Sequence, residues 1–440
     1  GRAFVCRLRA RPDLNGRLGV LGAQQEGGRW PVQVGAGGPT LLVRPQNLIP
    51  AGSAAGRARF LAERALAGLP EAGGRLLAER LGDSPGLALR VAAFLPPPET
   101  LVAVEGGAAW ALNPTWRAWE QLGPTPALGE YCSCALQGSR ALFAGGCAHL
   151  KSSDLFDALD HTWRRLPELR NSRGCCAAAA VGSQVVVCGG GLAEFHETKR
   201  RLPQLFRAYA EDPSTLSDRD RELVEGQMAR PGMQGMECCT AVEQLDLAAP
   251  ARCGWELVPA PMEPDRGIAY AAVVDHPAMG TYGGRVMLAG GRTPDGVCRR
   301  VLAYCPSSRR WEELPPMADA RVGSGACTHP RLGFVVAGGL SDHGAAGPVS
   351  VEAYTEECGW RRLAPLPGRR RHILLAVAND ALFALASPDV AAPRSVLGAR
   401  GYEAFRFHEP EGPWRHLPHL RLPEGLLPSC VFGLTAAMGP

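Results

Sequence analysis

The stretch Phe334-Val335-Val336-Ala337-Gly338-Gly339 is an apolar run that ends in a glycine doublet, and Tyr354 and Trp360 follow it. A short strand that ends in two glycines lets the backbone turn and lets a neighbouring aromatic side chain approach closely. The large side chains that follow can fill the space between two adjacent sheets. The stretch therefore predicts a small β-sheet unit that packs against others of its kind.

The same order of doublet, large side chain and tryptophan recurs along the chain. Further doublets end apolar runs at 142–146, 185–190 and 286–291. Four tryptophans follow these doublets: Trp163, Trp255, Trp311 and Trp360. Trp119 and Trp414 fit the same frame without a clean doublet. Repetition at such a period is the signature of a repeat architecture. We therefore predict six blades.

This pattern resembles the Kelch repeat over residues 100–437. The resemblance implies a mainly β fold, a six-bladed Kelch β-propeller, preceded by a small SH3-like barrel and a short helical segment. The apolar run at 427–434 has no tryptophan after it. We expect this last strand to complete the first blade, because closing the ring removes exposed sheet edges.

One interval between tryptophans, from Trp163 to Trp255, is much longer than the others and indicates an insertion at 192–237. The insertion is charged and has helical patterning, with a break at Pro203. Ser217 and Asp220 have the spacing of a helix capping box. The insertion is either a tolerated loop or an element that docks a partner.

Residues 1–50 contain four short apolar segments separated by turns that bear Gly or Pro, which is typical of strands. The segment resembles an SH3-like small barrel. A methyl-lysine reader would need an aromatic cage, and the segment offers only Phe4 and Trp30. We therefore interpret it as a structural or peptide-docking barrel.

Residues 55–95 carry Ala, Leu and Arg at helical spacing. Leu69, Pro70, Leu76 and Leu77 resemble part of an F-box, which in Kelch proteins binds the adaptor of a cullin-RING ubiquitin ligase. Two features depart from that pattern: Ala-Gly-Gly at 72–74 weakens the first helix, and the later tryptophan of the F-box is missing. The alternative is a helical linker.

Four arginines recur just before the innermost strand of a blade: Arg173, Arg266, Arg321 and Arg371. A ring would bring their guanidinium groups towards one face, where they suit carboxylate ligands through bidentate bonds. Arginines near this position contact acidic peptides in Kelch propellers that this chain resembles. We predict an acidic peptide site there, against the alternative that each arginine pairs locally as part of the repeat.

Catalytic patterns are weak in this sequence. Copper radical oxidases with a Kelch-like fold need a Tyr–Cys cross-link with histidine ligands, whereas the tyrosines and histidines here are scattered. Iron-binding Kelch proteins place acidic residues and His at four-residue steps. Asp157 and His161 have that step, but position 153 is serine. We find no nucleophile–base pair and no phosphate loop, and we expect no enzyme activity and no cofactor.

The composition is that of an ordinary globular protein, with 46% hydrophobic and 20% charged residues and a net charge of +4 over 440 residues. No basic tract with interleaved aromatics points to nucleic acid, and no apolar run is long enough to span a membrane. No secretory signal opens the chain. We expect a cytoplasmic protein, with a nuclear location as the alternative.

These patterns together predict a non-enzymatic protein-protein interaction module whose propeller binds a partner or substrate protein. If the F-box resemblance is genuine, the chain is the recognition subunit of a cullin-RING ligase. The alternatives are a Kelch scaffold of a cytoskeletal or ciliary assembly and, from another class, a Kelch-type metalloenzyme.

Overall fold

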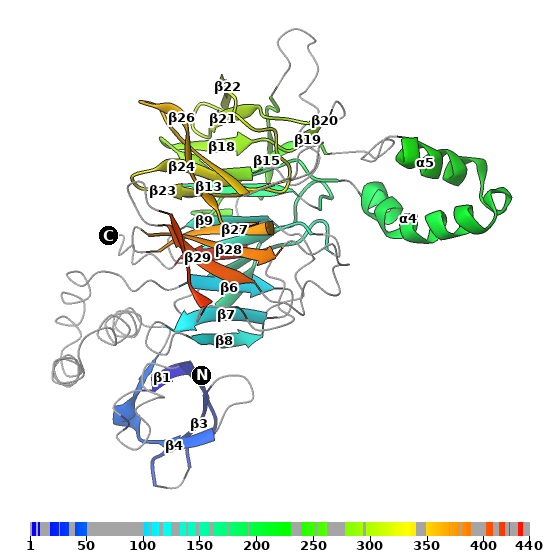
Figure 1. Ribbon diagram of the computed structural model, residues 1–440. Helices are drawn as coiled ribbons and strands as arrows, with labels where there is room; N and C mark the ends of the chain where they lie inside the picture. The colour runs from blue at the N-terminus through cyan, green and yellow to red at the C-terminus, as the bar shows by residue number, and fades with distance from the viewer. Residues whose placement is uncertain are drawn as a thin grey trace.

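The computed structural model in Figure 1 describes the main body of the chain and the small unit at its N-terminus. The residues described are 2–5, 8, 18–25, 27–34, 40–50, 101–105, 108–113, 118–124, 133–137, 140–146, 149–157, 162–174, 176–191, 193–229, 239–250, 254–261, 278–293, 296–339, 349–368, 370–378, 381–388, 402–407, 413–418, 422 and 430–433. The predicted helical segment 55–95, with Leu69, Pro70, Leu76 and Leu77, lies outside these residues.

Six four-stranded antiparallel sheets, numbered here in chain order, make up the main body of the described chain (Figure 1). The first contains β31 (Cys430–Gly433), β6 (Leu101–Glu105), β7 (Ala108–Asn113) and β8 (Ala118–Pro124). The second contains β9 (Ser133–Gln137), β10 (Arg140–Ala144), β11 (Ser153–Asp157) and β12 (Thr162–Arg165). The third contains β13 (Ala177–Val181), β14 (Gln184–Cys188), β15 (Val242–Asp246) and β16 (Glu256–Val258).

The remaining three sheets repeat the same strand order. The fourth contains β17 (Ala278–Tyr282), β18 (Arg285–Ala289), β21 (Val301–Cys305) and β22 (Arg310–Leu314). The fifth contains β23 (Gly325–His329), β24 (Gly333–Ala337), β25 (Val349–Thr355) and β26 (Gly359–Leu366). The sixth contains β27 (Arg370–Ala378), β28 (Ala381–Pro388), β29 (Glu403–Phe407) and β30 (Trp414–His416). A small hairpin, β19 (Arg292–Thr293) and β20 (Gly296–Val297), extends from the fourth sheet.

The first strand of each sheet lies at the centre, and these inner strands contact one another in the cyclic order β9, β13, β17, β23, β27, β31 and back to β9. The ring is closed by the end of the chain. In the first sheet, β31 pairs antiparallel with β6, with Phe432 opposite Val102. The prediction that the last strand completes the first blade is confirmed.

Apolar clusters between neighbouring sheets form the core, and the repeated tryptophans cross these gaps. The indole Nε1 of Trp311 donates to the carbonyl of Pro259 on the third sheet's side (2.7 Å), and that of Trp360 donates to Pro315 on the fourth sheet's side (2.7 Å). Trp414 makes the equivalent bond to Ala364 (2.8 Å). Each of these three tryptophans therefore buries apolar surface while its polar edge is satisfied, as the repeat predicts.

The insertion leaves the third sheet between β14 and β15. Its helices are α4 (Ala193–Glu211), which contains Pro203, and α5 (Asp218–Ala229), with the short 3-10 helix η3 (Pro213–Thr215) between them. The Ser217 hydroxyl accepts from the backbone of Asp220 (3.1 Å) and donates to its carboxylate (2.9 Å). The helices and the cap are confirmed within 193–229. The pair stands apart from the ring in Figure 1.

The N-terminal unit is a five-stranded antiparallel sheet in the order β4-β3-β2-β1-β5. Its elements are β1 (Arg2–Val5), β2 (Leu18–Leu21), β3 (Trp30–Val34), β4 (Thr40–Val43), η2 (Pro45–Asn47) and β5 (Leu48–Pro50). Val5, Val32, Val34 and Val43 are its buried core. The likeness to an SH3 barrel stays a prediction. Among the described helices, none has the length and apolar character required to cross a membrane.

Candidate functional site

Arg173, the first of the four predicted binding arginines, is fully buried (0% exposed). It lies just before β13, and its guanidinium donates from Nη2 to Glu243 (2.8 Å) and from Nη1 to the carbonyls of Gly189 and Ala241 (3.1 Å each). The Glu243 carboxylate is also fully buried. The two opposite charges are therefore paired inside the third sheet, at the glycine doublet, while Arg173 Nε has no hydrogen-bond partner among the described residues.

The fifth sheet repeats this arrangement around Arg321, which is 2% exposed. Its Nη2 donates to Glu352 (2.5 Å), and its Nη1 donates to the carbonyl of Gly338, the first glycine of that sheet's doublet (2.9 Å). The Glu352 carboxylate accepts in addition from the backbone of Ala318 (2.8 Å). The arginine, the glutamate of the third strand and the doublet form one repeated polar unit.

The predicted acidic peptide site needs correction at these two positions. Burial and internal pairing leave neither guanidinium available to a partner, so Arg173 and Arg321 follow the alternative of local pairing. Arg371 lies in β27 with its backbone opposite Ser387, and its side chain is outside the described set; Arg266 is not among the described residues. The sequence-based prediction did not include the buried glutamates that pair with these arginines. A single Glu in the apolar strand segment Val351-Glu352-Ala353 is a signal for such a buried pair.

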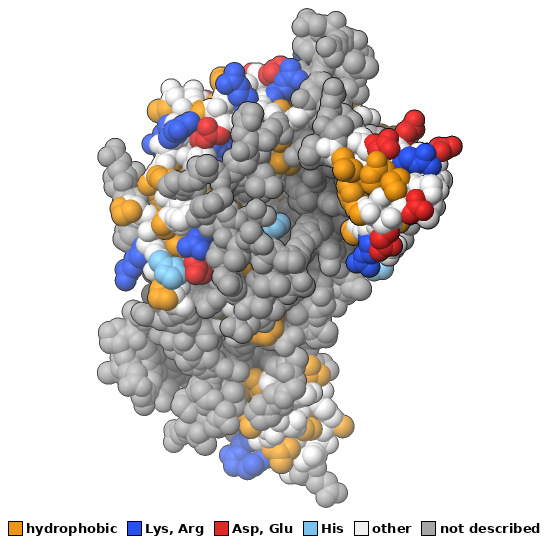
Figure 2. Space-filling model, turned by 45° about the vertical axis from the view of Figure 1, so that its right-hand side comes forward, with side chains coloured by type: hydrophobic (Ala, Val, Ile, Leu, Met, Phe, Trp, Pro, Cys, Tyr) orange, Lys and Arg blue, Asp and Glu red, His pale blue; other side chains and the backbone are white. Residues whose placement is uncertain are grey.

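The helical insertion offers an exposed apolar surface. Leu205 and Val224 are buried between α4 and α5, whereas Phe206 is 38% exposed and Met228 is 60% exposed. An ion pair from Arg201 to Asp220 (3.0 Å) joins the two helices. Figure 2 shows hydrophobic side chains gathered on this helical pair, with acidic and basic side chains around them. The helices therefore pack through their own core and leave Phe206 and Met228 exposed.

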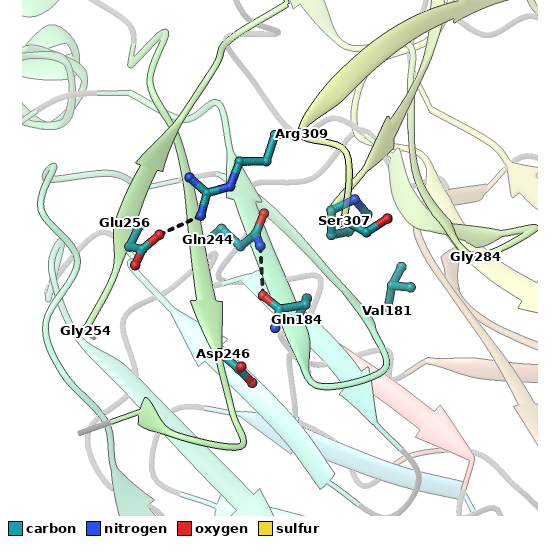
Figure 3. Close-up of a pocket in the computed structure, with 10 residues that line it drawn as sticks. Val181, Gln184, Gln244, Asp246, Gly254, Glu256, Gly284, Ser307 and Arg309 are labelled. Atoms are coloured by element: carbon teal, nitrogen blue, oxygen red, sulfur yellow. Dashed lines mark hydrogen bonds and ion pairs between the residues drawn. The ribbon is translucent and has the colours of Figure 1, made fainter. Parts of the chain in front are cut away.

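A polar cleft lies between the third and fourth sheets, where the β13–β14, β15–β16, β17–β18 and β21–β22 turns meet (Figure 3). Its volume is about 500 Å³. The lining residues are Val181, Gln184, Gln244, Asp246, Gly254, Glu256, Gly284, Pro306, Ser307 and Arg309. The third sheet supplies most of the polar side chains, and the fourth supplies Ser307 and Arg309.

Hydrogen bonds hold the lining of the cleft in place. Gln244, which is 7% exposed, donates to the Gln184 side-chain oxygen (2.7 Å) and accepts from the Tyr304 hydroxyl (3.0 Å). Across the opening, Arg309 of the fourth sheet's side pairs with Glu256 of the third sheet (2.8 Å, Figure 3). Hydrogen-bonded glutamine side chains therefore line the cleft, and an ion pair lies at its opening.

Arg309 has a left-handed backbone conformation, with φ of 56°. At the turns that close the outer hairpins of the third and fifth sheets, glycines take this conformation: Gly254 (φ 61°) and Gly359 (φ 65°). A side chain costs about 1–2 kcal/mol there. The strained residue is also the one whose guanidinium lies on the rim of the cleft, and strain of this kind gathers at functional sites.

The turn that carries Ser307 and Arg309 begins at Cys305. Its sulfur lies 3.2 Å from the Ser307 hydroxyl. Hydrogen bonds from Ser307 and Ser308 lower the pKa of Cys305 to about 7, whereas burial raises the pKa of Cys188 to about 12.

Cys305 is expected to react with iodoacetamide at a rate that is half-maximal near pH 7, because the thiolate is the nucleophile and its fraction rises through the pKa. Mass spectrometry of tryptic peptides after short alkylation pulses at several pH values measures this rate. Ser307→Ala should move the midpoint to higher pH, and Cys188 should stay unmodified throughout. A midpoint that is unchanged in Ser307→Ala would contradict the role given to the serine.

The described residues contain no cluster of three or more His, Cys, Asp or Glu side chains arranged to hold a metal ion. Asp157, singled out for its spacing to His161, instead pairs with Arg140 (3.2 Å) across two strands of the second sheet. His161 lies outside the described residues.

Comparisons with known proteins agree on the fold. No protein-family model matches the chain. Kelch-like protein 40 of Xenopus tropicalis is 29% identical over 102 residues, which are 23% of this chain and 16% of that relative's own length. The solved structure of YjhT superposes with a TM-score of 0.50 at 13% identity and covers 72% of this chain and 96% of its own.

The relative shares a segment of sequence only, and the solved structure shares the fold only. The segment is similar to a Kelch-like protein, and the structural likeness is one of fold over 72% of the chain. Together with the repeated doublets and tryptophans, these findings support a β-propeller fold of the Kelch-repeat type.

Proposed function

We propose that the chain is a non-catalytic protein-binding module that holds a partner or substrate protein against its propeller. The helical insertion carries the proposal. Phe206 and Met228 are exposed although α4 and α5 have a core of their own, and exposed apolar side chains rimmed by charges mark interaction sites. Methionine suits such surfaces because its flexible thioether adapts to a partner.

The resemblance at Leu69, Pro70, Leu76 and Leu77 supports a finer proposal, in which the chain is the recognition subunit of a cullin-RING ligase. Scaffolding in a cytoskeletal or ciliary assembly is the alternative. The cytoplasm, with the nucleus as the alternative, is the proposed location for either role.

Affinity purification of the tagged full chain from its source cell tests the binding proposal. The double variant Phe206→Asp/Met228→Asp should lose specific partners by at least about tenfold, since burial of one such side chain contributes about 1.5–3 kcal/mol. Leu257→Asp is the matched control, because Leu257 is 53% exposed on β16 outside the insertion. Equal recovery of the same partners with the double variant would show that the insertion does not bind them.

The same purification with Leu76→Ala/Leu77→Ala tests the ligase role. A cullin and its small adaptor should accompany the wild-type chain and disappear with this variant. If other partners are recovered without ligase components, the scaffold alternative replaces the ligase proposal.

A further inference from the structure

We infer that the cleft between the third and fourth sheets binds a basic side chain, an arginine or a lysine, of a partner protein. The inference deepens the proposed function, since the ligand is a segment of a protein. The proposed binding site is the cleft, which contains no residue of the helical insertion.

The gap between the fourth and fifth sheets is equivalent to the gap between the third and fourth sheets. Comparison of the two gaps shows which side chain is missing at the cleft. Arg285 is the first residue of β18 and pairs with Tyr282, the last residue of β17. Gln184 has the same place in the third sheet, as the first residue of β14 opposite Val181. The repeat therefore has an arginine at this place in one gap and a neutral amide in the other.

Arg285 bridges its gap by two ion pairs. It donates from Nη1 to Glu312 of its own sheet (2.7 Å), and it pairs with Glu356 of the fifth sheet. Its side chain is only 19% exposed. A guanidinium group thus fills the space between the fourth and fifth sheets.

One of the carboxylates that this arrangement requires is also present at the cleft, where Arg309 pairs with it at the rim (2.8 Å). Glu312 directly follows the repeat tryptophan of the fourth sheet, and Glu256 directly follows Trp255 in the third. Gln184 is neutral and so cannot form the ion pair that Arg285 forms with Glu312, and its amide oxygen accepts from Gln244. A neutral amide therefore stands in the place of Arg285, and the cleft of about 500 Å³ lies at this place in the gap.

The charge of the lining favours a cation. The lining carries two carboxylates, Asp246 and Glu256, against one guanidinium, and because Arg309 pairs with Glu256 the excess negative charge lies on Asp246. Hydrogen bonds from Ser183 and from the backbone of Ala248 (2.9 Å) lower the pKa of Asp246 below its ordinary value, so this carboxylate is ionised at neutral pH. Carboxylates accept bidentate bonds from a guanidinium and single bonds from an ammonium group.

Titration of the full chain with capped tripeptides, followed by saturation-transfer NMR, tests the inference. The probe is Ac-Gly-Arg-Gly-NH2, compared with the lysine peptide and with the peptide that carries neutral citrulline, which has nearly the same shape as arginine. The arginine or the lysine peptide should bind saturably in the millimolar range, and the citrulline peptide should bind at least about tenfold more weakly, since bonds to charged groups are the stronger ones.

Two variants place the binding in the cleft. Asp246→Asn should weaken binding of the arginine peptide by at least about tenfold. Gln184→Arg supplies an internal guanidinium, as Arg285 does in the next gap, and should abolish binding. Gln204→Arg is the matched control, because it adds the same charge at an exposed position of α4 and should leave binding unchanged. Thermal unfolding of each variant verifies that it is folded.

The inference is overturned if the folded wild-type chain binds neither basic peptide saturably, if citrulline binds as well as arginine, or if Gln184→Arg binds like the wild type. These outcomes are separate from a failure of the proposed function. Phe206→Asp/Met228→Asp changes the insertion and leaves the cleft intact, so it should bind the arginine peptide normally whether or not it loses cellular partners.

Discussion

Glu243→Ala is expected to lower the free energy of unfolding by about 3–5 kcal/mol, the range found when one partner of a buried ion pair is removed. The Glu243 carboxylate accepts from Arg173 (2.8 Å) and from the backbone amides of Arg170 (2.7 Å) and Asn171 (3.1 Å). Its removal leaves a fully buried guanidinium without its counter-charge. The midpoint and slope of urea unfolding measure the loss.

Glu256→Ala is the matched control for this change. Glu256 pairs with Arg309 at a similar distance (2.8 Å), but both side chains are about half exposed. Exposed ion pairs contribute about 0–1 kcal/mol, so the control should stay within about 1 kcal/mol of the wild type. Equal losses in the two variants would mean that water reaches Arg173, which would refute its structural role.

Gly145→Ala is expected to destabilise the ring by about 2–5 kcal/mol. Gly145 has φ of 74°, and a Cβ atom there would lie 2.3 Å from the carbonyl oxygen of Arg173. The left-handed conformation costs about 1–2 kcal/mol for a residue with a side chain, and overpacking against the backbone adds about 1–3 kcal/mol. The carbonyl cannot move freely, because it accepts from the backbone of Gly146 (3.1 Å).

Gly182→Ala separates the two contributions. Gly182 also has a positive φ, of 58°, but nothing lies within 4 Å of an added Cβ. Only the conformational cost of about 1–2 kcal/mol applies there. Urea unfolding of both variants should therefore rank Gly145→Ala as the more harmful, and an equal loss would show that the close contact at the doublet is relieved without cost.

The elements that local patterns specify were predictable. Doublets such as Gly338-Gly339 and tryptophans such as Trp360 indicate strand ends and gaps between sheets, since the backbone turn and the large side chain are local properties. The run at 427–434 pointed to the strand that closes the ring. Ser217 and Asp220 marked the start of α5 because a cap involves neighbouring residues only.

The partners of the predicted binding arginines could not be predicted from local patterns. Arg173 meets Glu243 across the whole insertion, and nothing near Arg173 in the sequence indicates that its partner is a buried carboxylate rather than a ligand. The cleft depends on which side chains two sheets bring together across a gap. Gln184 becomes informative only once strand register places it where Arg285 lies in the next sheet.

The pairing of β31 with β6 has a consequence for biosynthesis. β6 is translated more than three hundred residues before its partner strand β31. The edge of β6 therefore stays unpaired in the nascent chain until residues 430–433 leave the ribosome. Unpaired strand edges are templates for aggregation. A message truncated shortly before the codon for Cys430 would therefore yield a product in which β6 keeps an unpaired edge, a species suited to capture by chaperones and to degradation.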